Sequence, residues 1–195
     1  MSQALATPPR LSVAEFIEMI RPYPDEERWE LLDGQAILMS PPTERHQIVV
    51  MNLLRRIDRL AERVGCRALP GLGVLHDDVD DYAPIPDVVV RCGAPVEGGY
   101  AKDPVLVAEV ISPSTASNDR GRKLDFYRRI PTLRTVLIAY PGELRLEAWQ
   151  RADDDWRWSV LTQPADILPL PELGGELRLA DVYEGIDPVT TRSSP

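Results

Sequence analysis

The segment Val105–Ile111 is a nearly continuous apolar run, Val-Leu-Val-Ala-Glu-Val-Ile. A run of this length predicts a central strand with both faces covered, because a strand with one face in water alternates apolar and polar residues. The segment therefore predicts an α/β domain whose sheet is flanked by helices. It also places one carboxylate, that of Glu109, inside an apolar strand.

Capping and turn signals divide the rest of the chain into elements. Ser12 and Glu15 have capping-box spacing and predict a short amphipathic helix. The Asp33-Gly34 pair suits the two-residue turn of a β-hairpin, because this turn needs positive φ values. The predicted helices span residues 13–20, 43–64 and 118–130, and the predicted strands span residues 28–32, 35–39, 73–76, 86–90, 105–111, 134–140, 144–149 and 156–161.

The chain has 195 residues, of which 44% are hydrophobic, enough for one globular domain with a substantial core. We expect a flexible N-terminus over residues 1–11, a single domain over residues 12–186 and a disordered tail over residues 187–195. No apolar run has the length of a membrane span, and the N-terminus lacks the apolar core of a signal peptide, so we expect a cytoplasmic protein without membrane contacts. Cys66 and Cys92 fit neither a disulfide framework nor a zinc site, and we interpret both as buried thiols.

The net charge of −9 argues against a protein that coats nucleic acid nonspecifically, because that binding mode needs many cations. It leaves room for a nuclease, whose basic residues need only gather near the cleft. Arg120, Arg122, Arg128 and Arg129 form a basic stretch that could meet DNA phosphates, and a solvated helix face explains them almost equally well.

Three residues carry the candidate chemistry. Asp87 begins a short apolar strand, Glu109 lies in the central strand, and Lys123 lies on the following helix; only one other lysine, Lys102, occurs in the chain. A buried carboxylate costs several kcal/mol unless it is paired or metal-bound, which favours a functional interpretation of Glu109. Asp87 alone could be a turn cap, and Lys123 could pair within its own helix, with Asp119 or Tyr127.

An aspartate and a glutamate on paired strands can share a cation, because adjacent strands lie about 4.8 Å apart. An all-oxygen site of this kind suits Mg²⁺ or Mn²⁺. The ammonium of Lys123 could then orient the attacking water or stabilise charge on a phosphate. Two carboxylates and an ammonium are the groups that a metal-dependent phosphodiesterase needs.

Four segments occur in a familiar order: Trp29–Gly34, Pro86–Val88, Glu109–Thr115 and Asp119–Tyr127. Together they resemble a large bacterial family of restriction-endonuclease-like proteins within the PD-(D/E)xK nuclease superfamily. The resemblance covers about residues 13–149. It implies a restriction-endonuclease-like mixed β-sheet core flanked by helices, preceded by an N-terminal helix and hairpin.

The resemblance also implies site residues. Asp87, Glu109 and the carbonyl of Val110 would be metal ligands, Lys123 the catalytic lysine, and Glu30 an additional acidic residue at the edge of the site. The basic superfamily motif has its lysine two residues after the glutamate, where this chain has Ile111. The family form moves the lysine to the following helix, and Lys123 fits that relocation.

Other polar residues have less specific interpretations. Glu30 could equally be a solvated strand charge. We interpret His46 as a partly buried packing residue, although it could approach the cleft, and His76 as a strand-end residue. Ser112 and Ser114 suit turn and capping roles better than nucleophilic ones, because no His–Asp arrangement accompanies them.

These observations predict a divalent-metal-dependent endonuclease that hydrolyses phosphodiester bonds, with DNA as the expected partner. A homodimer would bring two sites to two strands, although no residue pattern shows one. The main alternative is a nucleic-acid-binding or interaction protein that keeps the fold and has lost turnover. A third is a metal-dependent hydrolase of small phosphate esters.

Overall fold

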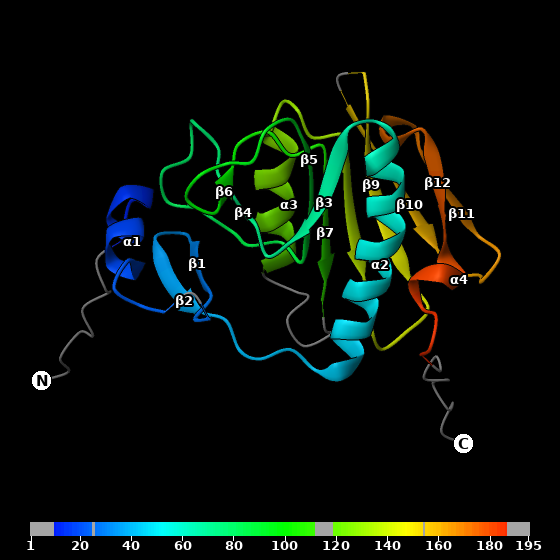
Figure 1. The fold of residues 1–195 in the computed structure, drawn as a ribbon, viewed down its shortest axis with the longest axis horizontal. Coiled ribbons are helices and arrows are strands. Elements are labelled where there is room, and N and C mark those ends of the chain that lie inside the picture. The colour runs from blue at the N-terminus through cyan, green and yellow to red at the C-terminus, as the bar shows by residue number, and fades with distance from the viewer. Residues whose placement is uncertain (1–9, 25, 112–118, 154, 187–195) are drawn as a thin grey trace, which may run out of the picture.

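The computed structural model describes residues 10–24, 26–111, 119–153 and 155–186 (Figure 1). The predicted flexibility of residues 1–9 and the predicted disorder of residues 187–195 lie outside the described residues. The helices are α1 (Val13–Ile20), α2 (Glu44–Arg63), α3 (Asp119–Arg129), the short 3-10 helix η1 (Pro171–Leu173) and α4 (Leu179–Val182). The strands are β1 (Trp29–Leu32), β2 (Gln35–Leu38), β3 (Cys66–Pro70), β4 (Gly73–Val74), β5 (Val88–Cys92), β6 (Tyr100–Ala101), β7 (Leu106–Val110), β8 (Thr135–Ala139), β9 (Leu146–Ala152), β10 (Asp155–Leu161), β11 (Ile167–Leu170) and β12 (Gly175–Arg178).

The central sheet has six strands in the order β10-β9-β8-β7-β5-β3. The pair β7 and β8 is parallel, and the other neighbours are antiparallel. This mixed sheet with helices confirms the predicted fold class. Parallel neighbours need a crossover connection, and the segment containing α3 supplies it between β7 and β8. That crossover brings α3 next to the strand that carries Glu109.

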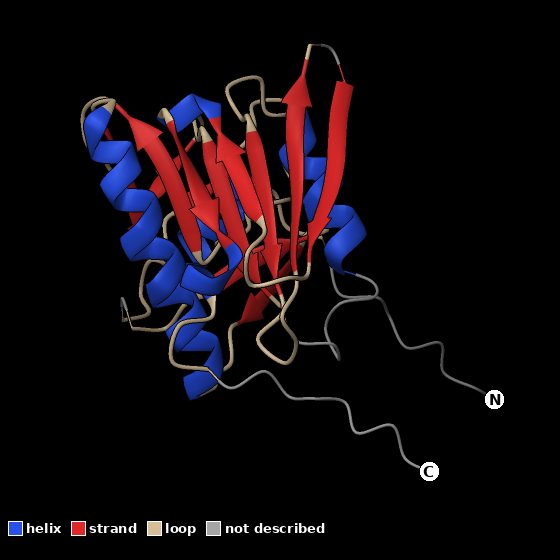
Figure 2. Ribbon diagram, turned by 90° about the vertical axis from the view of Figure 1, so that its right-hand side faces the viewer, coloured by secondary structure: helices blue, strands red, loops and turns tan. Residues whose placement is uncertain are grey.

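Both faces of the sheet are covered (Figure 2). On one face, α2 packs through Val49, Leu53 and Ile57, together with β11, β12 and α4. On the other face, Leu124 and Tyr127 of α3 pack against strand residues of the sheet. All five residues of β7 are buried, which confirms the prediction of a central strand covered on both sides.

The N-terminal unit of α1, β1 and β2 lies beside the sheet, at the left of Figure 1. Its hairpin turns at Asp33 and Gly34, which have φ values of 50° and 75°, as the sequence predicts. Leu31 exchanges two backbone hydrogen bonds with Ala83, of 3.2 and 2.8 Å. These bonds fix β1 against the segment that leads into β5, and so they position Glu30.

Several short strands, including β3, β11 and β12, are not predicted from the sequence. β11 contains Pro169, and proline argues against a strand because it cannot donate a ladder hydrogen bond. The residue is accommodated because β11 pairs only with β12.

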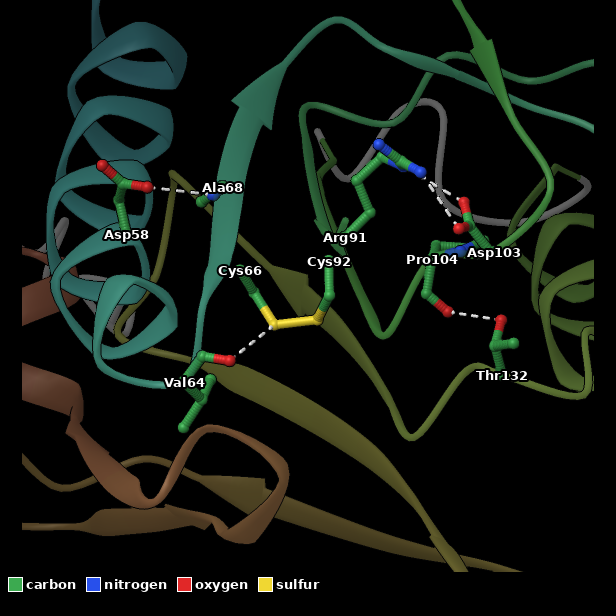
Figure 3. The surroundings of a disulfide bond; sticks show 9 residues. All are labelled: Asp58, Val64, Cys66, Ala68, Arg91, Cys92, Asp103, Pro104 and Thr132. Carbon is green, nitrogen blue, oxygen red and sulfur yellow. Dashed lines mark hydrogen bonds and ion pairs between the residues drawn. A yellow bond between two sulfur atoms is a disulfide. The ribbon is translucent and has the colours of Figure 1, made fainter. Parts of the chain in front are cut away.

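The interpretation of the cysteines as thiols is wrong, because Cys66 and Cys92 form a disulfide (Figure 3). The two residues lie directly opposite each other on β3 and β5. Nearby, the Ala68 amide of β3 donates to Asp58 of α2 at 3.0 Å, so β3 is also fastened to the helix. The pairing could not be seen in the sequence, because 26 residues separate the cysteines and β3 carries no clear strand signal.

None of the helices in the described part of the chain combines the length and apolarity needed to span a membrane.

Candidate active site

The structure brings the four predicted side chains to one cavity of about 330 Å³. Glu30 comes from β1, Asp87 directly precedes β5, Glu109 lies on β7, and Lys123 lies on α3. The cavity is also lined by His46 and Tyr127, and by apolar residues of which Ile37, Leu38, Met39, Ile85 and Ile111 are examples.

Asp87 and Glu109 are neighbours because of the strand register. Val88 of β5 pairs with Ala108 of antiparallel β7. Asp87 is one residue earlier and Glu109 one residue later, so continuing the register places them opposite each other. Residues opposed in this way have Cα atoms about 4.5 to 5.5 Å apart and point to the same face.

Glu109 is 8% exposed, yet it is well supplied with partners. The Tyr127 hydroxyl donates to its Oε1 at 2.6 Å, and the Lys123 ammonium lies 3.4 Å from the same oxygen. Burial raises the pKa of Glu109 to about 7; the charges of Asp87 and Glu30 add to the rise, whereas Lys123 and Tyr127 oppose it. The buried environment therefore favours the protonated form of Glu109, and the positive charge of Lys123 opposes this effect.

Lys123 lies between two carboxylates. Its Nζ donates to Glu30 Oε1 at 2.8 Å, in addition to the Glu109 contact. Burial lowers the pKa of Lys123, but the charges of Glu109 and Glu30 outweigh burial and raise the pKa above its ordinary value. The lysine is thus a charged ammonium inside the cavity, and its partners come from β1 and β7.

Glu30 is 6% exposed, so it is not a solvated strand charge. Its Oε1 accepts the Ile85 amide at 2.8 Å as well as the Lys123 ammonium. Glu30 therefore ties the N-terminal hairpin to the lysine and to the segment that precedes Asp87.

The carboxylate of Asp87 is held at both oxygens. Oδ2 accepts the Val110 amide at 2.7 Å, and Oδ1 lies 3.0 Å from His46 Nε2. The hydrogen bond to Asp87 raises the pKa of His46, and burial opposes this rise. Asp87 is thus bound across strands to β7 and does not act as a local turn cap.

Two further side chains line the cavity, and the sequence missed one of them, Tyr127. For His46 the sequence left two interpretations, packing and approach to the cleft; the structure supports the second, because His46 lines the cavity and faces Asp87. Thr43 caps α2 by accepting the His46 amide, which fixes this residue in the first helical turn. Tyr127 lies four residues after Lys123, and residues at this spacing share a helix face. That spacing is the signal that could have placed Tyr127 near Glu109.

The arginines of the basic stretch on α3 contact different parts of the protein. Arg122 forms an ion pair with Asp33 at 2.6 Å, and Arg128 stacks over the Trp149 ring. The side chain of Arg120 lies outside the described residues, as do Ser112 and Ser114. His76 bonds to backbone atoms of Asp78 and Arg129, away from the carboxylate cluster.

The cavity residues fit a divalent cation by their donor chemistry. Asp87 and Glu109 are adjacent oxygen donors, the ligand type that Mg²⁺ and Mn²⁺ prefer. The cavity is lined by three carboxyl groups and one ammonium, and the ammonium contacts two of the three. Within the described residues, no three His, Cys, Asp or Glu side chains already cluster as ligands of one ion. The structure shows the Val110 amide against Asp87, and the role of its carbonyl as a ligand stays a prediction.

Comparison with known proteins identifies a matching family model, two similar proteins and one similar structure. Residues 13–181 match the model of the Uma2 family, described as "Putative restriction endonuclease". Two uncharacterized proteins of Synechocystis sp. are similar: one is 26% identical over 91% of this chain and 94% of its own length, and the other is 27% identical over 77% and 86%. The crystal structure of a "putative nuclease belonging to DUF820" from Anabaena variabilis covers 89% of this chain and 97% of its own, with a TM-score of 0.69 and 18% identity. This structure has the same fold.

Proposed function

Because the chain belongs to the Uma2 family of putative restriction endonucleases, we propose that it is a divalent-metal-dependent endonuclease that hydrolyses phosphodiester bonds in DNA. The observation that supports this most strongly is the convergence of Glu30, Asp87, Glu109 and Lys123 on one cavity. These residues come from four separate segments of the chain.

In this proposal, Asp87 and Glu109 hold Mg²⁺ or Mn²⁺, and the Val110 carbonyl is a further ligand. The cation would neutralise charge on the scissile phosphate and lower the pKa of water. His46 orients Asp87 through its 3.0 Å contact, and Tyr127 fixes Glu109 by donating to it at 2.6 Å.

Lys123 places its positive charge where a phosphate enters the cavity. The ammonium is held between Glu30 and Glu109, so it is positioned before substrate binds and stabilises charge that develops on the phosphate. Glu30 acts through Lys123 and is a positioning residue. A homodimer, predicted from the class of protein, stays a prediction.

Cleavage of plasmid DNA tests the proposal. We expect nicking or linearisation in Mg²⁺ or Mn²⁺, none in EDTA, and loss of cleavage in Glu109→Gln. Glu97→Gln is the matched control, because Glu97 is exposed and outside the cavity. Undiminished cleavage by Glu109→Gln would reject the assignment, and hydrolysis of only a small phosphodiester would favour the phosphate-ester alternative.

A further inference from the structure

Three of the four tryptophans lie together on the β9–β10 hairpin. Trp149 of β9 pairs directly with Trp158 of β10, with ring centroids 6.0 Å apart. Trp156 lies two pairs further along, opposite Arg151, and therefore on the same face of the hairpin. Trp158 is 53% exposed, a large fraction for an indole. The hairpin forms the edge of the sheet and stands at the upper right of Figure 2.

Arginines stack on these rings. The Arg128 guanidinium of α3 lies 5.6 Å from the Trp149 centroid, and that of Arg151 lies 4.6 Å from the Trp156 centroid. Arg134 is bonded to Arg151 through the backbone at 2.8 Å. We call the six side chains the aromatic–arginine surface: Arg128, Arg134, Trp149, Arg151, Trp156 and Trp158.

The positive charge of this surface is offset only in part: the Arg151 guanidinium donates to the backbone carbonyls of Leu133, Arg128 and Ile130 at 2.9 to 3.1 Å. Within the described part of the chain, no carboxylate forms an ion pair with Arg128, Arg134 or Arg151, whereas Arg91 pairs with Asp103 and Arg122 with Asp33. Burial lowers the pKa of Arg151, and the charges of Arg134 and Arg128 lower it further, which shows that the three guanidiniums act on one another. A protein with net charge −9 thus keeps a local cationic cluster.

Nearby acids offset the cluster only in part. Glu172 lines a pocket with Arg134 and Arg151; burial raises the pKa of Glu172, and the charge of Arg134 opposes this rise. The Trp158 indole N–H donates to Glu147 at 3.4 Å. Glu147, on the same face of β9, is fully buried and held by Arg145 at 2.6 Å. Asp153 and Asp155 lie at the turn of the hairpin, beyond Trp156.

The surface adjoins the candidate active site. Val136 lines the cavity and pairs with Trp149, which in turn pairs with Trp158. Trp158 is therefore two strand spacings, about 10 Å, from the cavity-lining strand. Helix α3 carries both Lys123 and Arg128, so it links the cavity to the surface.

We propose that the aromatic–arginine surface binds an unpaired stretch of the nucleic-acid strand whose phosphodiester bond enters the cavity. The proposal rests on the proposed function and adds a substrate class to it: single-stranded or locally unpaired nucleic acid. Indole rings stack on base faces, which a duplex hides. The guanidiniums of Arg128 and Arg134 bind the phosphates between the bases, whereas that of Arg151 is held by backbone carbonyls. A second copy of the chain is a poorer occupant, because a twofold interface here would bring the arginines of both copies together, and none of them has an ion-pair partner in the described part of the chain.

Anisotropy with fluorescein-labelled oligodeoxythymidylate and with a labelled duplex of equal length tests this, in EDTA so that nothing is cleaved. We expect Trp158→Ala to weaken single-strand binding by about 10-fold, a size typical of losing one stacked base. Arg128→Ala should weaken it as well, through the loss of a phosphate contact. Arg128→Ala should also reduce the slope of log K against log salt by roughly 0.7, the value for one phosphate contact. The matched controls Tyr23→Ala, another exposed aromatic, and Arg59→Ala, an exposed arginine of α2, should bind as the wild type does.

Equal affinity of the wild type and both variants would overturn the proposal, as would equal or tighter binding of the duplex. Dissociation of a dimer by Trp158→Ala without any change in oligonucleotide affinity would show a protein interface and also overturn it. The experiments distinguish failure of the binding surface from failure of the proposed nuclease function. Binding that depends on Trp158 in a protein that cleaves nothing supports the surface and rejects the nuclease, whereas cleavage unaffected by either substitution supports the nuclease and rejects the surface.

Discussion

At the scale of single residues, Lys123 is the site residue that should tolerate substitution least. It is one of only two lysines, and its ammonium contacts two carboxylates inside the cavity. A planar guanidinium cannot occupy the compact place of an ammonium. We therefore expect Lys123→Arg to keep metal affinity and to reduce cleavage about 10²-fold, the loss typical of one positioned transition-state donor.

Steady-state cleavage rates check this expectation. Lys102→Arg is the matched control, because Lys102 is exposed and pairs with Asp77 on the surface. Cleavage at the wild-type rate by Lys123→Arg would remove Lys123 from the catalytic residues.

Glu109 gives a test that needs no substrate. In the wild type, Mn²⁺ at about 100 times its Kd should stabilise the fold by about 2.7 kcal/mol, which raises Tm by roughly 5 to 10 °C for a chain of this size. Glu109→Gln should fold and should lose this shift, because it removes a ligand while it relieves repulsion in a buried acidic cluster. Thermal melts with and without Mn²⁺ measure the difference; Glu97→Gln should keep the shift. A full shift in Glu109→Gln would show that Glu109 is not a ligand.

The site residues that could be predicted are those marked by a pattern within one segment of the sequence. Glu109 stands out because a carboxylate interrupts an apolar strand, and the motif order adds Asp87, Lys123 and Glu30. The sequence favoured packing over the cleft for His46, because its partner Asp87 is 41 residues away and only the packing of α2 on the sheet brings them to 3.0 Å.

At the scale of elements, the structure that follows from local sequence signals was predicted, and the structure that depends on tertiary contacts was not. The central strand and the long helix were predicted because periodicity and caps act locally. β3, β11 and β12 were missed because they are short or contain proline, and their pairing depends on tertiary contacts. The Cys66–Cys92 disulfide was missed for the same reason, since it depends on the register of β3 with β5.

The disulfide closes a loop over a sequence separation of 26 residues. Loop-closure entropy predicts that reduction costs about 3 to 4 kcal/mol of folding free energy. Urea unfolding of the wild type with and without reductant measures this loss. Cys66→Ala/Cys92→Ala should unfold identically in both conditions, and an equal midpoint for the oxidised and reduced wild type would contradict the stabilising role.

At the scale of the whole molecule, the fold gathers four distant segments at one place. The N-terminal hairpin supplies Glu30, the antiparallel pair of β5 and β7 aligns Asp87 with Glu109, and the crossover helix supplies Lys123. The matched family and the shared fold agree with this arrangement. The proposed function therefore depends on whether the cavity binds a divalent cation.

A crystal of the full chain soaked in Mn²⁺ tests that point most directly, by anomalous diffraction. If Asp87 and Glu109 hold the metal as proposed, one strong anomalous peak should lie in the cavity, within about 2.0 to 2.4 Å of carboxylate oxygens of both residues. No peak in the cavity at saturating Mn²⁺, or a peak bound by only one of these carboxylates, would contradict it.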